Sequence, residues 1–322
     1  AGVGDICYQT LGVDAQPTTD PTHKKVYFDG TSYTNEKPAK ATLQVIEGTN
    51  FDGGEGAAKV FDGDLDTKWC ANGNSDPTQC YVIYEASTPT YLMGYKMSTG
   101  GDTQTYPGRN PKEFRIQGSN DKASWTDVYY QKDDNLLEAK NKETYTVYFN
   151  TSTQYKYFRF TVVSSEGGTF FQISELELLA SEFGVKVKEG NAAALDGNTN
   201  AKWEGNPTQT VTLQILGEPL NMAGYQFTTG NDNANYTGRN PKDFTIETKT
   251  ADGDWQQADK KVGYALMQDK NFYPYIFGMQ TPQTAVGEVR ITVTATQGGG
   301  YFQLGEVALI GCTEAHNFVS AE

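Results

Sequence analysis

Residues 94–116 have the sequence GYKMSTGGDTQTYPGRNPKEFRI, and residues 224–246 have the sequence GYQFTTGNDNANYTGRNPKDFTI. About half of the paired positions are identical, and the two stretches lie about 130 residues apart, which is the size of one domain. A match of this length at this spacing indicates that one structural unit occurs twice in the chain.

Three further pairs of blocks follow the same order in both halves of the chain. They are LQVIEGT (43–49) with VKVKEGN (185–191), AAKVFDGDLDTKW (57–69) with AAALDGNTNAKW (192–203), and GGTFFQISELELL (167–179) with GGGYFQLGEVALI (298–310). Four blocks in one order indicate the duplication of a whole domain.

Within each unit the residue pattern is typical of β-strands. Apolar and polar residues alternate in TYTVYFN (144–150), KYFRFTVV (156–163) and EVRITVTA (288–295), and turn-forming clusters such as TADGD (250–254) separate such runs. No stretch carries the apolar stripe of a long amphipathic helix. The sequence therefore predicts an all-β fold of two tandem antiparallel β-sandwich modules of the jelly-roll type.

The repeats also set the expected domain boundaries. We expect an N-terminal extended arm at 1–41, module 1 at 42–181, module 2 at 182–313 and a C-terminal tail at 314–322. The junction between the modules is short and has few linker residues, so we expect the modules to be docked against each other.

Composition limits the partners of the chain. Its formal net charge of −14 repels nucleic acid and anionic lipid, and no apolar run is long enough to insert into a membrane. We therefore expect neither nucleic acid binding nor membrane insertion, and the acidic, Gly- and Tyr-rich composition favours a secreted or cell-surface protein. The oligomeric state is not indicated.

The four cysteines allow three pairings. Cys70 and Cys80 flank a short polar loop, which favours a local disulfide, and Cys7 would then pair with Cys312. Free thiols are the alternative. Disulfides would indicate an oxidising compartment.

No catalytic motif is present in the sequence. The only two histidines, His23 and His316, lie in the terminal segments, and there is no phosphate-binding loop and no HExxH motif. We therefore expect a protein that is not an enzyme.

The ordered motifs A…DGD/N…W, GYxxxTG…D…GRNPKxFxI and GGxxFQxxE resemble those of the discoidin family, the coagulation factor V/VIII C-type modules of the galactose-binding-like superfamily. The resemblance covers nearly all of residues 42–311, twice. It implies non-catalytic binding of a glycan or cell-surface glycoconjugate, as in the carbohydrate-binding modules of bacteria, together with structural calcium. A cell-adhesion or protein-binding pair and an accessory region of a larger glycan-active enzyme are the alternatives.

The residues themselves support a calcium site in module 1. Asp62, Asp64 and Thr67 place hard oxygen ligands in one Gly-containing loop. The family resemblance adds the backbone carbonyls of Lys59, Thr67 and Ser174 and the carboxylate of Glu175. The alternative is an Asp-Gly turn that binds no ion.

Module 2 repeats this arrangement with two weaker ligands. The set implied by the resemblance consists of Asp196, Asn198 and Glu306 with the carbonyls of Ala193, Ala201 and Gly305. Because Ala201 replaces a Thr and Asn198 replaces an Asp, one hydroxyl and one carboxylate are lost. We expect the second calcium site to be weaker than the first, or to be filled partly by water.

Sugar-binding members of the family use an aromatic ring on the last long loop, which implies Phe170 and Tyr301 as stacking residues. Alternation along the strand turns these two rings outward and their neighbours Phe171 and Phe302 inward. The alternative places both rings of each pair in the core. Trp69 and Trp203 are also expected to be core residues.

The long loop before NPK supplies polar candidates in both modules. They are Asp102, Tyr106, Arg109 and Asn110 in module 1 and Asp232, Tyr236, Arg239 and Asn240 in module 2. These side chains either contact sugar hydroxyls or form an internal Asp–Arg pair that holds the loop. These loops contain no His, and in this the sequence departs from the galactose-specific members of the family that it resembles, so galactose specificity is not expected.

Overall fold

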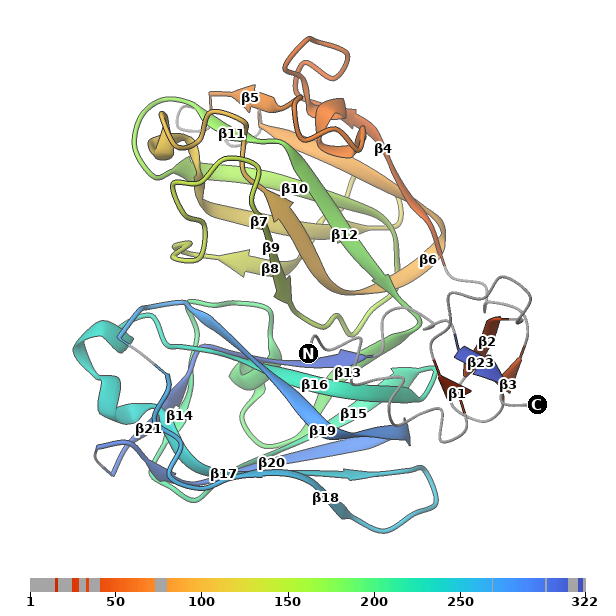
Figure 1. The fold of residues 1–322 in the computed structure, drawn as a ribbon, viewed down its shortest axis with the longest axis vertical. Coiled ribbons are helices and arrows are strands. Elements are labelled where there is room, and N and C mark those ends of the chain that lie inside the picture. Colours follow the sequence, from red (N-terminus) through yellow and green to blue (C-terminus); the bar gives the residue numbers. More distant parts are fainter. Residues whose placement is uncertain are drawn as a thin grey trace.

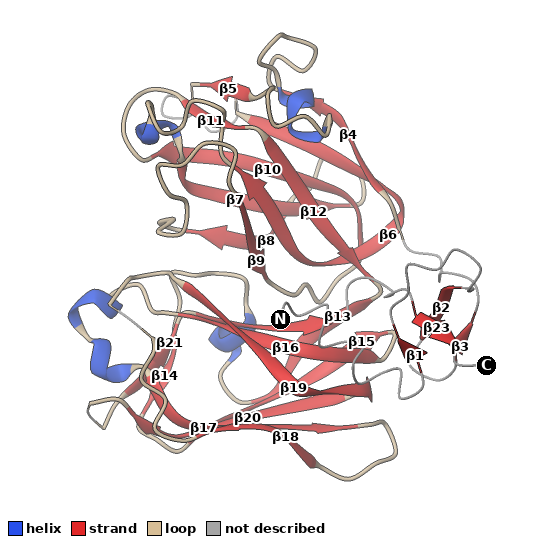
Figure 2. Cartoon of the chain, in the orientation of Figure 1, coloured by secondary structure: helices blue, strands red, loops and turns tan. Residues whose placement is uncertain are grey.

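The structure is a computed structural model that describes residues 15–16, 25–28, 33–34, 41–72, 80–267, 269–298, 300–311 and 318–320. Figure 1 shows two β-sandwiches stacked one above the other, with a small sheet beside the second. Figure 2 shows that strands dominate and that the helical elements are short turns between them. The predicted all-β fold of two tandem antiparallel modules is confirmed. Among the described residues, no helix is both long and apolar enough to cross a membrane.

Module 1 is built on one long bent strand, β6 (Tyr81–Ser98). Its first part pairs with β4 and β10, and its last part pairs with β9 and β12, so β6 takes part in both layers of the sandwich. The strand order is β12-β6-β10-β7-β8, with β4 and β9 also paired to β6. The remaining elements are β4 (Leu43–Gly48), η1 (Ala57–Phe61), β5 (Trp69–Ala71), η3 (Pro107–Arg109), β7 (Pro111–Ser119), β8 (Thr126–Gln131), β9 (Thr144–Tyr148), β10 (Tyr155–Ser165), β11 (Phe171–Ile173) and β12 (Glu175–Ser181).

Module 2 repeats this plan, but two strands replace the long bent one. β15 (Gln209–Gly217) and β16 (Leu220–Thr228) are separated at Gly217, whose φ of +72° suits glycine. The sheets have the orders β13-β15-β20-β17-β18 and β19-β16-β22. The remaining elements are β13 (Phe183–Glu189), η4 (Ala192–Leu195), β14 (Trp203–Gly205), η5 (Asn233–Asn235), η6 (Thr237–Arg239), β17 (Pro241–Lys249), β18 (Gln256–Lys261), β19 (Pro274–Val286), β20 (Glu288–Thr296), β21 (Phe302–Leu304) and β22 (Glu306–Gly311).

A buried Trp lies at the same place in each core. Trp69 packs edge-on against Phe171, with 4.7 Å between ring centroids, and Trp203 packs against Phe302 at 4.8 Å. Both Trp side chains are fully buried, so the prediction that they are core residues is confirmed. Burying a side chain of this size stabilises the fold by roughly 1.5–3 kcal/mol.

The terminal segments form a sheet of their own. β23 (Phe318–Ser320) lies between β1 (Ala15–Gln16) and β2 (Lys25–Phe28), and β3 (Tyr33–Thr34) pairs with β2. The expected extended arm and tail are therefore paired through their backbones, because strand edges in the two segments complete each other's hydrogen bonds.

The two modules are docked, as the short junction predicts. Asn150 of module 1 donates to the carbonyl of Leu309 (3.0 Å) and accepts from its N–H (2.7 Å). Gln226 of module 2 makes the reciprocal pair with the backbone of Tyr148, at 2.8 and 2.9 Å. Met93 of module 1 packs into the hydrophobic core of module 2. The side-chain amides of Asn150 and Gln226 are buried. Any other docking arrangement that left one of these amides without its hydrogen-bond partners would cost about 1–3 kcal/mol, so the docking is specific.

A second contact joins a loop of module 2 to strand β8, which lies at the end of its sheet in module 1. The N–H of Tyr130 donates to the carbonyl of Gly197 (2.7 Å), and the N–H of Thr199 donates to the carbonyl of Tyr130 (3.0 Å). Asn198 is bridged to Tyr130 in a parallel sense. The loop thus covers an edge that would otherwise expose backbone groups.

The structure does not contain the expected Cys70–Cys80 disulfide. Cys70 carries a free thiol. The thiol of Cys80 donates to the backbone carbonyl of Asn72, which lies at the start of the polar loop. Cys7 and Cys312 lie outside the described residues.

Candidate functional site

The candidate site lies at one end of each sandwich, where a short two-stranded sheet meets the long loop before NPK. In module 1 the sheet pairs β5 with β11, and in module 2 it pairs β14 with β21. The side chains of Trp69 and Trp203, on one face of these strands, are buried in the core. The side chains of Gln172 and Gln303, the next positions after the buried Phe residues, contact the site lysines instead.

The aromatic pair of each last loop is divided between surface and core, as strand alternation predicts. Phe170 is 48% exposed and Tyr301 is 37% exposed, whereas Phe171 and Phe302 are fully buried. The alternative in which both rings are core residues is wrong. An exposed ring on a rigid strand end offers an apolar face to a ligand.

An exposed Arg–aromatic stack accompanies this ring in module 1. The guanidinium carbon of Arg109 lies 4.1 Å from the ring centre of Tyr106 and 5.9 Å from that of Phe170. Tyr106 is 46% exposed. Stacking fixes the planar guanidinium and leaves its edge donors able to bind a polar ligand.

The same stack occurs in module 2. The guanidinium carbon of Arg239 lies 3.8 Å from the ring centre of Tyr236 and 5.1 Å from that of Tyr301. Tyr236 is as exposed as Tyr106. Two separate segments of the chain therefore build the same surface.

A network of four side chains holds the site of module 1 in place. The ammonium group of Lys68 donates to both carboxylate oxygens of Asp102, at 3.0 and 2.9 Å, and to the Oε1 of Gln172 at 2.9 Å. Gln172 donates back to Asp102 at 2.8 Å, and Arg109 reaches the same Oε1 at 3.4 Å. The stacked Arg is thus tied to β11, the strand that the exposed ring of Phe170 immediately precedes.

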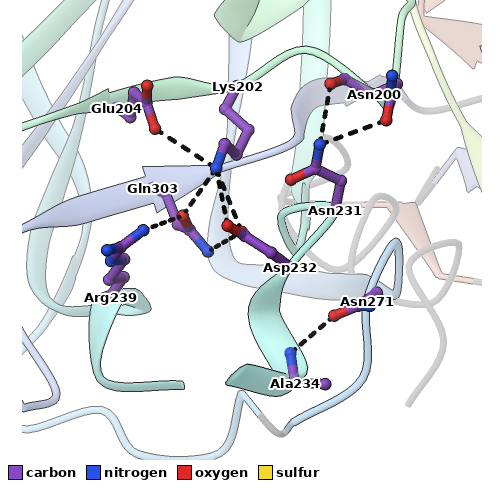
Figure 3. A network of polar contacts seen from close by, with 9 residues as sticks. All are labelled: Asn200, Lys202, Glu204, Asn231, Asp232, Ala234, Arg239, Asn271 and Gln303. Atoms are coloured by element: carbon purple, nitrogen blue, oxygen red, sulfur yellow. Dashed lines mark hydrogen bonds and ion pairs between the residues drawn. The ribbon is translucent and has the colours of Figure 1, made fainter. Parts of the chain in front are cut away.

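Figure 3 shows the matching network of module 2. Lys202 donates to both carboxylate oxygens of Asp232 at 3.2 Å and to Gln303 at 3.3 Å. Gln303 donates to Asp232 at 3.0 Å, and Arg239 donates to Gln303 at 3.3 Å. The contacts agree one by one with those of module 1.

The internal Asp–Arg pair considered from the sequence is not formed. Asp102 and Asp232 pair with lysines instead, and the arginines stack on tyrosines. Sequence reasoning missed the two Lys and two Gln residues of the networks. The signal was available, because the repeated blocks end in TKW and AKW and contain FFQ and YFQ.

The network also determines the ionisation of Asp102. Burial acts to raise the pKa of this carboxyl, but hydrogen bonds from Lys68 and Gln172 and the charge of Lys68 outweigh it, so the pKa is lowered from its usual value. Asp102 is therefore ionised at neutral pH.

The two Asn residues of the loop lie beneath the surface. Asn110 and Asn240 are buried, and Asn110 donates to the carbonyl of Glu138 at 3.2 Å. Buried amides have no access to a ligand, so these residues brace the loop and do not form part of the exposed contact surface. The Pro that follows each Asn keeps its backbone extended, as expected.

The β5 and β14 strands differ in the residue that follows the buried Trp and in the residue after it, and the first difference lies beside the site lysine. Glu204 lies 3.5 Å from Lys202, whereas the equivalent position in module 1 is Cys70. There Glu55, from a different loop, approaches Lys68 at 3.9 Å. Each lysine therefore has a glutamate nearby, but that glutamate comes from a different part of the module in each case.

The side chains of the predicted calcium ligands of module 1 come together where the loop at 62–67 meets the start of β12. The N–H of Gly63 donates to Glu175 at 2.9 Å, the N–H of Asp64 donates to Asp62 at 3.0 Å, and the hydroxyl of Thr67 donates to Asp62 at 2.6 Å. Lys59 is the nearest cation, 4.0 Å from Asp62. Burial, followed by the hydrogen bond with Asp62, raises the pKa of Glu175 to about 7. Burial acts to raise the pKa of Asp62, but hydrogen bonds from Thr67 and from the N–H of Asp64 outweigh it and lower the pKa. An ionised Asp62 beside the Glu175 carboxyl provides oxygen ligands that fit a divalent cation.

Module 2 places the equivalent residues in a more buried setting. Asp196 and Gly197 both donate backbone N–H groups to Glu306, at 3.1 and 3.0 Å, and Asn198 donates to Asp196 at 2.8 Å. Burial, then the adjacent Asp196, raise the pKa of Glu306 well above its usual value. In neither module do the described residues form a cluster of three or more His, Cys, Asp or Glu side chains, so a bound cation would rely on amide, hydroxyl and carbonyl oxygens as well.

The residues whose carbonyls the resemblance names lie close to these carboxylates in the chain. Lys59 lies in η1 and Ala193 in η4, while Ser174 and Gly305 immediately precede the two Glu residues. Ala201 closes the turn through its N–H, which donates to the carbonyl of Asn198 at 3.0 Å.

Comparison with known proteins supports the resemblance noted in the sequence. A family model described as the F5/8 type C domain matches residues 39–176. The first module is an F5/8 type C domain. Module 2 lies outside the matched residues and repeats the sequence blocks, strand plan and site network of module 1. A search of curated proteins gave no match.

Several solved structures are similar to this chain, over one module or over most of its length. One is the CBM32-1 and CBM32-2 pair of ZmpB from Clostridium perfringens in complex with GalNAc, at 12% identity and a TM-score of 0.33, covering 83% of this chain and 89% of that one. Another is the module CBM32-5 of CpGH89 from the same organism in complex with GalNAc-β-1,3-galactose, at 15% identity and a TM-score of 0.33, covering 43% of this chain and 94% of that one. A third is a fucolectin from striped bass serum, Morone saxatilis, at 13% identity and a TM-score of 0.30, covering 84% of this chain and 95% of that one.

Proposed function

We propose that this chain binds glycans without catalysis, through one site on each module. The observation that carries the proposal is the exposed surface made by Arg109, Tyr106 and Phe170, which Arg239, Tyr236 and Tyr301 repeat in module 2. A pyranose has an apolar C–H face and an edge of vicinal hydroxyls. The exposed ring suits the first, and the fixed guanidinium and its Asp and Gln neighbours suit the second.

The form of the surface favours a binding role. The polar side chains of each site are already tied to one another, so they hold a shape and require little ordering when a ligand arrives. A sugar held by one exposed ring and one guanidinium would have little of its surface buried, so single sites are expected to bind weakly. The chain would act outside the cell or at a cell surface, where glycans are displayed.

Calcium forms part of the proposal as a structural ion. Asp62, Asp64, Thr67 and Glu175 would hold it in module 1, and Asp196, Asn198 and Glu306 in module 2. The ion would neutralise facing carboxylates and fix the loop that leads into β5 or β14. Those strands carry the Trp beneath the binding surface, so calcium would stabilise the site without contacting the sugar.

A glycan array tests the proposal directly. The intact chain is screened in calcium beside a Phe170→Ala, Tyr301→Ala double variant, which is expected to lose binding. The matched control is the Trp125→Ala, Trp255→Ala double variant. It removes two aromatic rings that also stack on arginines, Arg159 and Arg290, at positions away from the candidate sites.

The outcomes separate the two main readings of the surface. Binding by the wild type and the control, but not by the site variant, supports a glycan-binding role. If the folded, calcium-loaded wild type binds no glycan, the proposal is wrong, and the exposed stacks would then serve contact with a protein partner.

A further inference from the structure

The two candidate sites lie on the same side of the molecule. In module 1 the loop between β8 and β9 braces the site, since Asn141 accepts a hydrogen bond from the N–H of Gln104 at 2.7 Å. In module 2 Asn271 braces the site in the same way through the N–H of Ala234, also at 2.7 Å (Figure 3). Asn135, from the bracing loop of module 1, donates to the carbonyl of Asn271 at 2.9 Å. The two bracing loops therefore touch.

Figure 1 shows where the site-bearing ends of the two modules lie in the whole molecule. The ends formed by β5 and β11 in module 1 and by β14 and β21 in module 2 both lie toward the left of the view, away from the small terminal sheet on the right. The loops that brace the sites are in contact between them. A flat partner approaching this side meets both sites.

The relative position of the sites is fixed by the docking. Asn150 and Gln226 are buried, and each bonds both backbone groups of a residue in the other module. Met93 adds apolar contact with the core of module 2. Two modules held at a fixed separation by buried contacts lose less conformational entropy when both sites bind than two modules joined by a flexible linker.

We infer that the pair acts as one bivalent surface, which binds a partner that displays the same or a closely related sugar at two or more points. This inference rests on the proposed function. Matching Arg, aromatic, Lys, Asp and Gln groups in both sites require similar sugar chemistry, and their common direction requires that the two sugars face one side. A second site held in place contributes an effective concentration of about millimolar or more, which raises avidity by about 10²–10⁴.

The test uses glycans that bind on the array, printed at a low and a high density. The wild type is expected to bind at least tenfold more tightly at high density than at low density. Phe170→Ala and Tyr301→Ala, each tested alone, are expected to keep low-density binding within about twofold to threefold and to lose the gain at high density. Trp125→Ala is the control and is expected to keep the gain.

A docking variant tests whether the fixed geometry matters. Asn150→Ala combined with Gln226→Ala leaves both sites intact and removes the buried hydrogen bonds between modules. It is expected to bind normally at low density and to lose most of the gain at high density. If its gain equals that of the wild type, the fixed docking does not produce bivalence and the inference is wrong.

A repeated sugar can belong to one long glycan or to separate glycans on one surface. Soluble oligosaccharides of increasing length distinguish these two sources. A step in affinity at one length, seen by calorimetry with wild type but not with Tyr301→Ala, identifies a single chain that spans both sites. No step, with a gain at high density, identifies separate glycans on one surface.

The failures of the two proposals are distinguishable. Absence of wild-type binding at both densities overturns the proposed function and the bivalent surface together. Binding whose dependence on density is the same in the wild type and in both single variants overturns only the bivalent surface.

Discussion

Gly63 and Gly197 occupy the same turn of the two modules, at φ +73° and +76°, but only Gly197 packs against the other module. A Cβ on Gly197 would lie 2.2 Å from the carbonyl oxygen of Val128, whereas a Cβ on Gly63 would meet nothing within 4 Å. Duplication thus produced two copies of one turn, of which one became part of the interface between modules.

Gly197→Ala should destabilise the protein more than Gly63→Ala. Both variants place a side chain in the left-handed region, at a cost of roughly 1–2 kcal/mol. Only Gly197→Ala also has to displace the backbone of β8, so it should loosen the docking of the modules. Thermal unfolding measures the first effect, and small-angle scattering with limited proteolysis at the junction measures the second. Equal stability and equal scattering of the two variants would contradict the role assigned to Gly197.

Much of the fold could be predicted from the sequence because the repeat and the strand alternation are local patterns. The exposed Phe170 and buried Phe171, for example, follow from the period of two along a strand. The reciprocal amides at Asn150 and Gln226 could not be predicted, because no pattern in either module indicates which residues of the other it will meet.

The site was predicted less completely than the fold. Asp102 and Arg109 were expected in the right loop, but the partner of Asp102 is Lys68, which is 34 positions away in the chain. A lysine just before a core Trp carries no local signal of its own. Only its recurrence as Lys202 marked it, and the same holds for Gln172 and Gln303.

Lys68→Met should weaken glycan binding at module 1 by positioning, since Lys68 does not belong to the exposed stack. Loss of its ammonium leaves Asp102 without its cation and frees Gln172, which also holds Arg109. Binding to module 1, measured in a Tyr301→Ala background, should fall by about tenfold, or 1.4 kcal/mol.

Two controls define this effect. Lys112→Met removes a lysine whose nearest carboxylate, that of Asp133, is 3.9 Å away, and should leave binding unchanged. In saturating calcium, a pH profile of glycan binding by the wild type should be flat from pH 5 to 8. Because the folded pKa of Asp102 is lowered, its contribution is present above the unfolded value and is lost only in more acidic solution. A loss of binding between pH 8 and 6 would contradict the assignment.

Removal of calcium should lower the stability of both modules. At a calcium concentration of about 100 times the dissociation constant, a bound ion adds about 2.7 kcal/mol to the free energy of unfolding. Calorimetric unfolding in calcium and in a chelator measures the difference. Glu175→Gln should remove the response of module 1 and Glu306→Gln that of module 2. Unchanged unfolding of the wild type in chelator would show that these loops hold no ion.

The stability of module 1 should fall as the pH rises from 5 to 8, because of Asp134. Burial, opposed by hydrogen bonds from the N–H groups of Leu137 and Leu136 and reinforced by the charges of Glu166 and Asp133, raises the pKa of this carboxyl to about 7.

The sign of the effect follows from proton linkage. The folded pKa of Asp134 lies above the unfolded value of about 3.9, so the folded state binds the proton more tightly and the free energy of unfolding decreases between the two values. The decrease approaches 1.4 kcal/mol per pH unit at most. Asp134→Asn keeps an oxygen that can accept from Leu136 and Leu137 and has no charge to bury. In saturating calcium, urea unfolding at pH 5 and pH 8 should therefore show a smaller loss of stability for the variant than for the wild type. An equal loss in both proteins would mean that Asp134 is already ionised in the folded state at pH 5.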